Sequence, residues 1–125
     1  MSKQSHKEIA SDFLILCAKG DSRRAFSLYV GPGFKHHNAY FKGDGETLML
    51  AMEQAAKDQP DKTFDMKQVL HDGNLVAVHS HFKLTPKDPG YAVIHILRFQ
   101  GDKIVELWDF AQAIPAEQIN ENGMF

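Results

Sequence analysis

Residues 91–115 read YAVIHILRFQGDKIVELWDFAQAIP. Two runs rich in β-branched and aromatic residues flank a Gly-Asp pair at positions 101–102, which is typical of a two-residue hairpin turn. Such a turn sets the register of the two strands, so opposed residues can be counted outward from it. For a hairpin without a β-bulge, the count predicts the pairs Phe99–Ile104, Leu97–Glu106, His95–Trp108 and Val93–Phe110.

In this register, one face of the hairpin carries a few polar groups within an apolar and aromatic surface. Its residues are Tyr91, Val93, His95, Leu97, Phe99, Ile104, Glu106, Trp108, Phe110 and Gln112. That composition is typical of a small-molecule pocket. Asp109 falls on the opposite face in this count. A β-bulge, which is common near active sites, would bring it round, and the sequence leaves this open.

The motif R-F-x-G-D-K-I-V-E-x-W-D-x-x-Q-x-I-P, residues 98–115, resembles the C-terminal signature of SnoaL-like polyketide cyclases. The segment Lys35-His36-His37-Asn38 resembles the Q-H-N segment of the same family, which lies in the nuclear transport factor 2-like superfamily. The resemblance implies an α+β cone, with N-terminal helices packed on a curved, mainly antiparallel sheet enclosing a pocket. It implies function only broadly, since this superfamily includes isomerases, dehydratases, epoxide hydrolases, cyclases and non-catalytic binders.

Two positions depart from the family pattern. His95 stands where many relatives carry the aspartate of Asp-x-x-Arg, and Leu107 stands where relatives often carry the histidine of Glu-His-Trp-Asp. An acid at the base of the pocket is therefore lost or exchanged for an imidazole.

The bulk composition fits a single domain over residues 1–125, because 43% hydrophobic residues suffice for a core. A net charge of −2 gives no electrostatic footprint for nucleic acid. The single cysteine, Cys17, excludes an intrachain disulfide. The polar first residues and the lack of a long apolar run predict a soluble, cytoplasmic protein without a signal peptide or membrane contact.

Periodic patterns predict the other elements. Apolar spacing, as in Ile9, Phe13 and Leu16, predicts helices over residues 3–18, 21–29 and 46–57, with a short strand over 34–38 between the second and third helices. Strands over 63–71 and 74–84 flank an Asp72-Gly73 turn, and counting outward predicts the pairs Leu70–Leu75, Gln68–Ala77, Met66–His79 and Phe64–His81. Helices followed by an antiparallel meander indicate the α+β class.

The seven histidines are the main candidates for chemistry. If the loop at 85–90 joins the two hairpins in an even register, His79 and His81 share a face with His95 and converge near His37. Three interpretations stay open: hydrogen-bonded histidines without a catalytic role, acid–base catalysts, or a metal site built on the His-x-His pair. The pair lacks a carboxylate or thiolate to complete a ligand set, so the sequence predicts neither a metal nor a cofactor.

The favoured hypothesis is a cofactor-independent enzyme that transfers a proton next to a carbonyl, as in aldol cyclisation or isomerisation. The alternative is a non-catalytic domain that binds a small ligand. His95 and His79 are the predicted catalytic residues, and desolvation is expected to lower the pKa of His95 below about 6.5. The predicted substrate-binding residues are His37, Asn38, His81, Glu106, Trp108, Asp109 and Gln112.

The predicted partners are a small molecule and a second copy of the chain. An uncovered apolar sheet face usually marks an interface, so a homodimer through the outer face is expected. The residues assigned to that face are Val76, Val78, Phe82, Ile94, Ile96, Val105 and Leu107.

Overall fold

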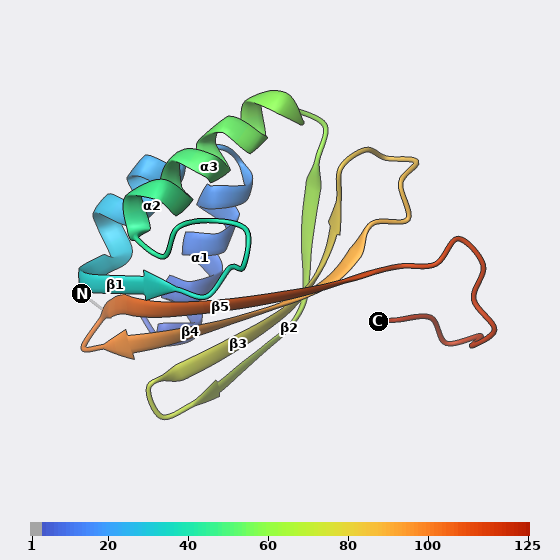
Figure 1. Ribbon diagram of the computed structural model, residues 1–125. Helices are drawn as coiled ribbons and strands as arrows, with labels where there is room; N and C mark the ends of the chain where they lie inside the picture. Colours follow the sequence, from blue (N-terminus) through green and yellow to red (C-terminus); the bar gives the residue numbers. More distant parts are fainter. Residues whose placement is uncertain (1–3) are drawn as a thin grey trace.

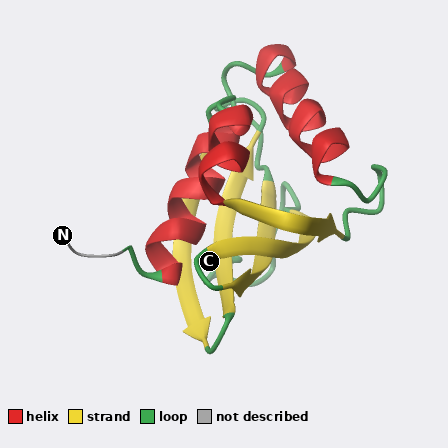
Figure 2. Cartoon of the chain, turned by 90° about the vertical axis from the view of Figure 1, so that its left-hand side faces the viewer, coloured by secondary structure: helices red, strands yellow, loops and turns green. Residues whose placement is uncertain are grey.

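The computed structural model describes residues 4–125, in which helices pack on a five-stranded sheet (Figure 1). The elements are α1 (His6–Ala18), α2 (Ser22–Tyr29), β1 (Val30–His36), α3 (Gly45–Asp58), β2 (Thr63–Asp72), β3 (Leu75–Lys83), β4 (Tyr91–Gln100) and β5 (Lys103–Ala113). The strand order is β1-β5-β4-β3-β2, in which β1 runs parallel to β5 and the other neighbours are antiparallel. The strands of this one sheet run in widely different directions (Figure 2), so the sheet is strongly twisted. The predicted α+β architecture is confirmed.

Helix α1 begins three residues later than predicted. The predicted start, Lys3, lies outside the described residues. Ser5 is the N-cap of a capping box: its hydroxyl accepts from the Glu8 amide at 3.1 Å, and the Glu8 carboxylate accepts from the Ser5 amide at 2.9 Å. Ile9, four residues after Ser5, is the first residue of the apolar face of α1 that packs on the sheet. Cys17, near the end of the helix, is buried in the same core. Cys17 is thus a small apolar core residue.

The chain leaves α1 through Gly20, which lies against α3. Gly20 has φ +90°, and a Cβ added there would lie 2.8 Å from the Cβ of Ala56. The left-handed backbone and the close approach both exclude a side chain. This contact holds the C-terminal ends of α1 and α3 together.

We expect Gly20→Ala to lower the free energy of unfolding by about 1–3 kcal/mol, because strain and overlap act together. Gly73→Ala is the matched control, since Gly73 has φ +60° but no atom within 4 Å of the added Cβ. Urea denaturation of both variants separates backbone strain from contact. Equal losses would contradict a packing role for Gly20.

The hairpin of β4 and β5 contains a bulge that the sequence count lacked. Phe99 faces Ile104, as predicted, but the register then shifts and Arg98 faces Glu106, so Val105 is the extra residue. The predicted pairs Leu97–Glu106, His95–Trp108 and Val93–Phe110 are therefore wrong; the structure pairs these β4 residues with Leu107, Asp109 and Ala111. Val105 is buried, and Gly31 of β1 passes close to its side chain, so the bulge falls where β1 approaches β5.

The hairpin of β2 and β3 also differs from its predicted register. Asp72 faces Leu75, which makes Gly73-Asn74 the turn and places it one residue later than predicted. A second shift between Met66 and Gln68 displaces the pairs beyond it. The four predicted pairs are wrong, and the observed ones include Leu70–Ala77, Gln68–His79, Met66–Ser80 and Phe64–Phe82.

The register between the two hairpins decides which residues share a face. Val78 faces His95 and His79 faces Ile94, so the predicted even register is wrong. We call the face with Val78 and His95 the inner face, because its valines and leucines join α1 in the buried core, and the face with His79 and Ile94 the outer face. The reason is burial: the helices cover the β-branched residues of β3 rather than its histidines.

This register also corrects the predicted dimer surface. Ile94 and Ile96 lie on the outer face, but the other assigned residues do not form one patch with them. On the inner face lie Val76, Val78, Phe82 and Leu107, while Val105 is the buried bulge residue. The homodimer itself stays a prediction.

Strand β1 is longer than expected. It begins at Val30, before the predicted start at residue 34, and includes the Gly31-Pro32-Gly33 segment; its pairing with β5 is irregular between Val30 and Lys35. Within residues 4–125, no helix is long and apolar enough to cross a membrane.

Candidate functional site

The centre of the inner face is formed by His95 on β4 and Asp109 on β5. The two residues are directly opposed because the Val105 bulge turns Asp109 to this side, which answers the question that the sequence left open. Opposed residues in an antiparallel pair have Cβ atoms about 4.5–5.5 Å apart. The imidazole of His95 and the carboxylate of Asp109 are thus cross-strand neighbours on the inner face.

The His95 ring lies in an apolar setting. Its Nδ1 atom is buried and has no hydrogen-bond partner among residues 4–125. The Phe64 ring of β2 stands edge-on to it at 5.9 Å between centroids, and Val78 faces it from β3. Burial lowers the pKa of His95 to about 4, although the nearby Asp109 charge opposes the shift by favouring the imidazolium. The lowered pKa was predicted, but the opposing carboxylate is Asp109 rather than Glu106.

Asn38 joins this pair from the loop after β1. Its Nδ2 donates to Oδ2 of Asp109 at 3.0 Å. The loop is held by His36, whose Nδ1 accepts from the Asn38 amide at 3.1 Å and whose Nε2 donates to the Lys42 carbonyl at 2.6 Å. Asn38 and Asp109, both predicted as substrate-binding residues, therefore lie together beside His95.

Ser80 is a polar residue of this face that the sequence reasoning missed. It is fully buried, and within the described part of the chain its Oγ has no hydrogen-bond partner. Ser80 faces Val93, which is the next pair on the same face after Val78–His95, so Ser80 lies diagonal to His95. Alternation along His79-Ser80-His81 could have indicated it, because one serine must face away from two histidines.

His79 and His81 lie on the outer face, so the predicted grouping of His79 with His95 is wrong. Both rings stack on Phe125, at 5.3 Å and 4.6 Å between centroids. His81 Nε2 also donates to the Pro89 carbonyl at 2.8 Å. Among the described residues, no group of three or more histidine, cysteine, aspartate or glutamate side chains is placed to hold a metal ion.

A second polar cluster on the outer face is centred on Glu106. This carboxylate accepts from His37 Nε2 at 2.7 Å and from Arg98 Nε at 2.9 Å, with Lys35 Nζ at 3.7 Å. The hydrogen bond from His37, followed by that from Arg98, holds the pKa of Glu106 below its usual value. The His37 ring stacks on Trp108 at 5.0 Å.

Five predicted substrate-binding residues therefore lie apart from the inner-face site, and His81, described above, is one of them. Glu106, Trp108 and Gln112 face Arg98, Ile96 and Ala92 on the outer side. His37 is bound to Glu106 there. For Glu106, Trp108 and Gln112 the physical reason is the bulge, because one extra residue exchanges the faces of all positions of β5 beyond it.

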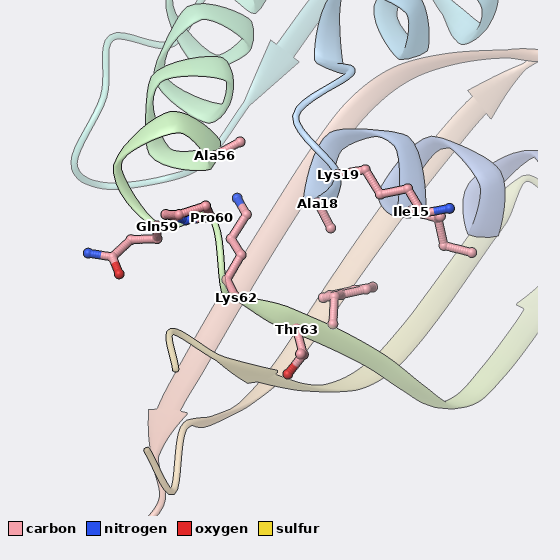
Figure 3. Close-up of a pocket in the computed structure, with 9 residues that line it drawn as sticks. Ile15, Ala18, Lys19, Ala56, Gln59, Pro60, Lys62 and Thr63 are labelled. Carbon is pink, nitrogen blue, oxygen red and sulfur yellow. The ribbon is translucent and has the colours of Figure 1, made fainter. Parts of the chain in front are cut away.

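A pocket of about 470 Å³ opens between the C-terminal ends of α1 and α3 and the start of β2 (Figure 3). This volume lies within the usual range for small-molecule sites, roughly 300–1,000 Å³. The lining residues are Ile15, Ala18, Lys19, Ala56, Gln59, Pro60, Lys62, Thr63 and Phe64. Phe64 is shared, since its ring also contacts His95. The pocket and the inner-face site are thus separated by one aromatic side chain.

Helices packed on a strongly twisted five-stranded sheet form the cone-shaped fold of nuclear transport factor 2-like domains. A family model for the SnoaL-like domain matches residues 12–107, so the chain belongs to this family. The predicted family is confirmed.

Three solved structures illustrate the likeness. A nuclear transport factor 2-like protein of unknown function from Cytophaga hutchinsonii has a TM-score of 0.71 at 14% identity, covering 90% of this chain and 95% of its own. A proposed SnoaL-like isomerase from Agrobacterium tumefaciens gives 0.71 at 14% identity, covering 86% and 97%. A proposed polyketide cyclase from Acidithiobacillus ferrooxidans gives 0.68 at 17% identity, covering 90% and 92%. Such distant likenesses carry the fold alone, and no curated protein matches the chain.

Proposed function

We propose that this protein is a cofactor-independent enzyme that transfers a proton next to a carbonyl group, as in isomerisation or aldol cyclisation. The observation that carries the proposal is the buried Nδ1 of His95, which has no hydrogen-bond partner among residues 4–125, on a residue directly opposed to Asp109 in the sheet. A buried polar atom without a partner is rare in proteins and is often kept for a ligand or a reaction.

The chemistry follows from the charge states. With a pKa of about 4, His95 is neutral at pH 7 and can accept a proton. In the tautomer that carries its hydrogen on Nε2, the Nδ1 lone pair takes a proton from the carbon next to the carbonyl. The C–H electrons move to the carbonyl oxygen as an enolate. Asp109 then stabilises the imidazolium, which returns the proton to the product at carbon or oxygen.

Two further groups support this step. The Ser80 hydroxyl has no hydrogen-bond partner in the described residues and can donate a hydrogen bond to the enolate oxygen. Asn38 holds one oxygen of Asp109 by a 3.0 Å hydrogen bond, which fixes the direction of the carboxylate. The proposed isomerase and cyclase among the similar structures are consistent with this reaction type.

The direct test is exchange of carbonyl-adjacent protons in deuterated water. Cyclic ketones and 1,3-diketones are incubated with the purified protein, and loss of the adjacent proton signal is followed by NMR. We expect at least one compound to exchange faster than in buffer with an equal concentration of imidazole. A compound that binds to the inner face without faster exchange would instead support a non-catalytic binding domain.

A further inference from the structure

The pocket of Figure 3 carries positive charge without a counter-ion in its lining. Lys62 precedes β2 and is half-buried, and Lys19 follows α1 at the other side of the opening. Among its lining residues the polar members besides these lysines are Gln59 and Thr63, and none is a carboxylate. The rest of the wall is apolar.

Two other lysines bind a partner through their ammonium groups. Lys103 donates to the Leu28 carbonyl at 2.8 Å, and Lys67 pairs with Asp65 at 2.7 Å. Within residues 4–125, the Nζ of Lys62 makes neither a hydrogen bond nor an ion pair. A half-buried ammonium without a partner is costly for the folded state.

The ionisable group that acts on the pKa of Lys62 is the Cys17 thiol, and this thiol is uncharged at pH 7. Burial raises the pKa of Cys17 to about 12, so the thiol stays protonated at pH 7. Burial also lowers the pKa of Lys62. A bound anion would offset this cost, because a nearby negative charge favours the ammonium form.

We propose that this pocket binds a small, largely apolar organic acid, with its carboxylate paired to Lys62. Lys19 adds positive charge at the opening, and the body of the acid packs on the apolar wall formed by Ile15, Ala56 and Phe64. A carboxylate is favoured over a free phosphate because that wall suits an apolar body. The proposal concerns binding and does not depend on turnover at His95.

The test compares three probes by isothermal titration calorimetry and amide NMR: cinnamate, its neutral analogue cinnamamide, and inorganic phosphate. We expect cinnamate to bind at least about 10-fold more tightly than cinnamamide, since a charge-assisted bond is lost in the neutral analogue. Amide shifts are expected at Ala18, Ala56 and Thr63. Lys62→Met should weaken cinnamate binding by a similar factor and leave cinnamamide binding unchanged.

Lys87→Met is the matched control, because Lys87 is exposed in the loop after β3 and the substitution changes the net charge equally. This variant should bind cinnamate like the wild type. Equal affinity for cinnamate and cinnamamide would overturn the proposal, as would equal loss in the two lysine variants. The proposal would also be overturned if phosphate bound as tightly as cinnamate, or if the amide shifts were confined to another surface. A third contradicting result would be no binding of cinnamate at about 10 mM, which is above the millimolar Kd of a weak ligand.

Discussion

Replacing His95 with alanine is expected to lower turnover of an exchanging carbonyl compound by about 10²–10⁴, the usual contribution of a positioned general base. The reason is that the imidazole nitrogen that would accept the proton is His95 Nδ1, which is buried and unpartnered beside Asp109. The loss should appear in kcat, because proton abstraction belongs to the chemical step. His95→Asp should keep part of the activity, since it restores the acid that relatives carry at this position.

The matched control is His79→Gln, which removes a histidine of the neighbouring strand on the outer face, where its ring stacks on Phe125. This variant is expected to turn over like the wild type. The steady-state rates of both variants, with circular dichroism to check folding, decide the assignment. An active His95→Ala variant, or an equal loss in His79→Gln, would remove His95 from the mechanism.

The second large effect is a loss of stability at mildly acidic pH. The pKa of His95 is about 4 in the folded chain and about 6.5 in a model peptide, so the unfolded state takes up the proton first. The contribution of neutral His95 to the free energy of unfolding is therefore fully present above pH 6.5, and it declines as the pH falls towards 4. A shift of this size corresponds to at most about 3 kcal/mol in the free energy of unfolding.

Urea denaturation at pH 7, 6 and 5 measures this decline, and His95→Leu should flatten it because leucine does not titrate. Glu106 acts in a lower window: its folded pKa lies below the model value of 4.5, so its contribution is lost as the pH falls through that folded pKa. His79→Gln serves again as the control and should keep the wild-type slope. The same slope in His95→Leu would mean that another group carries the dependence.

The sequence predicted the elements of the fold better than their pairing. Helical spacing and two hairpin turns are local signals, and both correspond to elements of the structure. The register of a strand pair changes when one strand gains or loses a single residue. In this chain the alternation of apolar and polar residues does not reveal such a slip. Both faces of β4 are apolar, with Val93 and Leu97 on one side and Ile94 and Ile96 on the other, so a slip leaves the hydrophobic pattern almost unchanged.

The ambiguity of strand register also explains which residues of the candidate site were predicted and which were not. His95 and Asn38 were singled out from residue type and family resemblance, and they lie together with Asp109 at the inner face. Ser80 was missed and His79 was misplaced, because the register between the hairpins was one residue out. The environment of His95 was predicted correctly in direction, since apolar strand residues flank it in either register.

The bulge at Val105 has a consequence for comparing relatives. Beyond it, the number of residues since the turn decides whether a carboxylate or an indole faces His95, because Asp109 and Trp108 are consecutive. An alignment that matches the Trp-Asp letters but omits one position upstream would transfer the role of one to the other. Equivalence between family members therefore has to be judged on the hydrogen-bonded ladder of the strands, and a one-codon length change there can alter a pocket without any substitution in it.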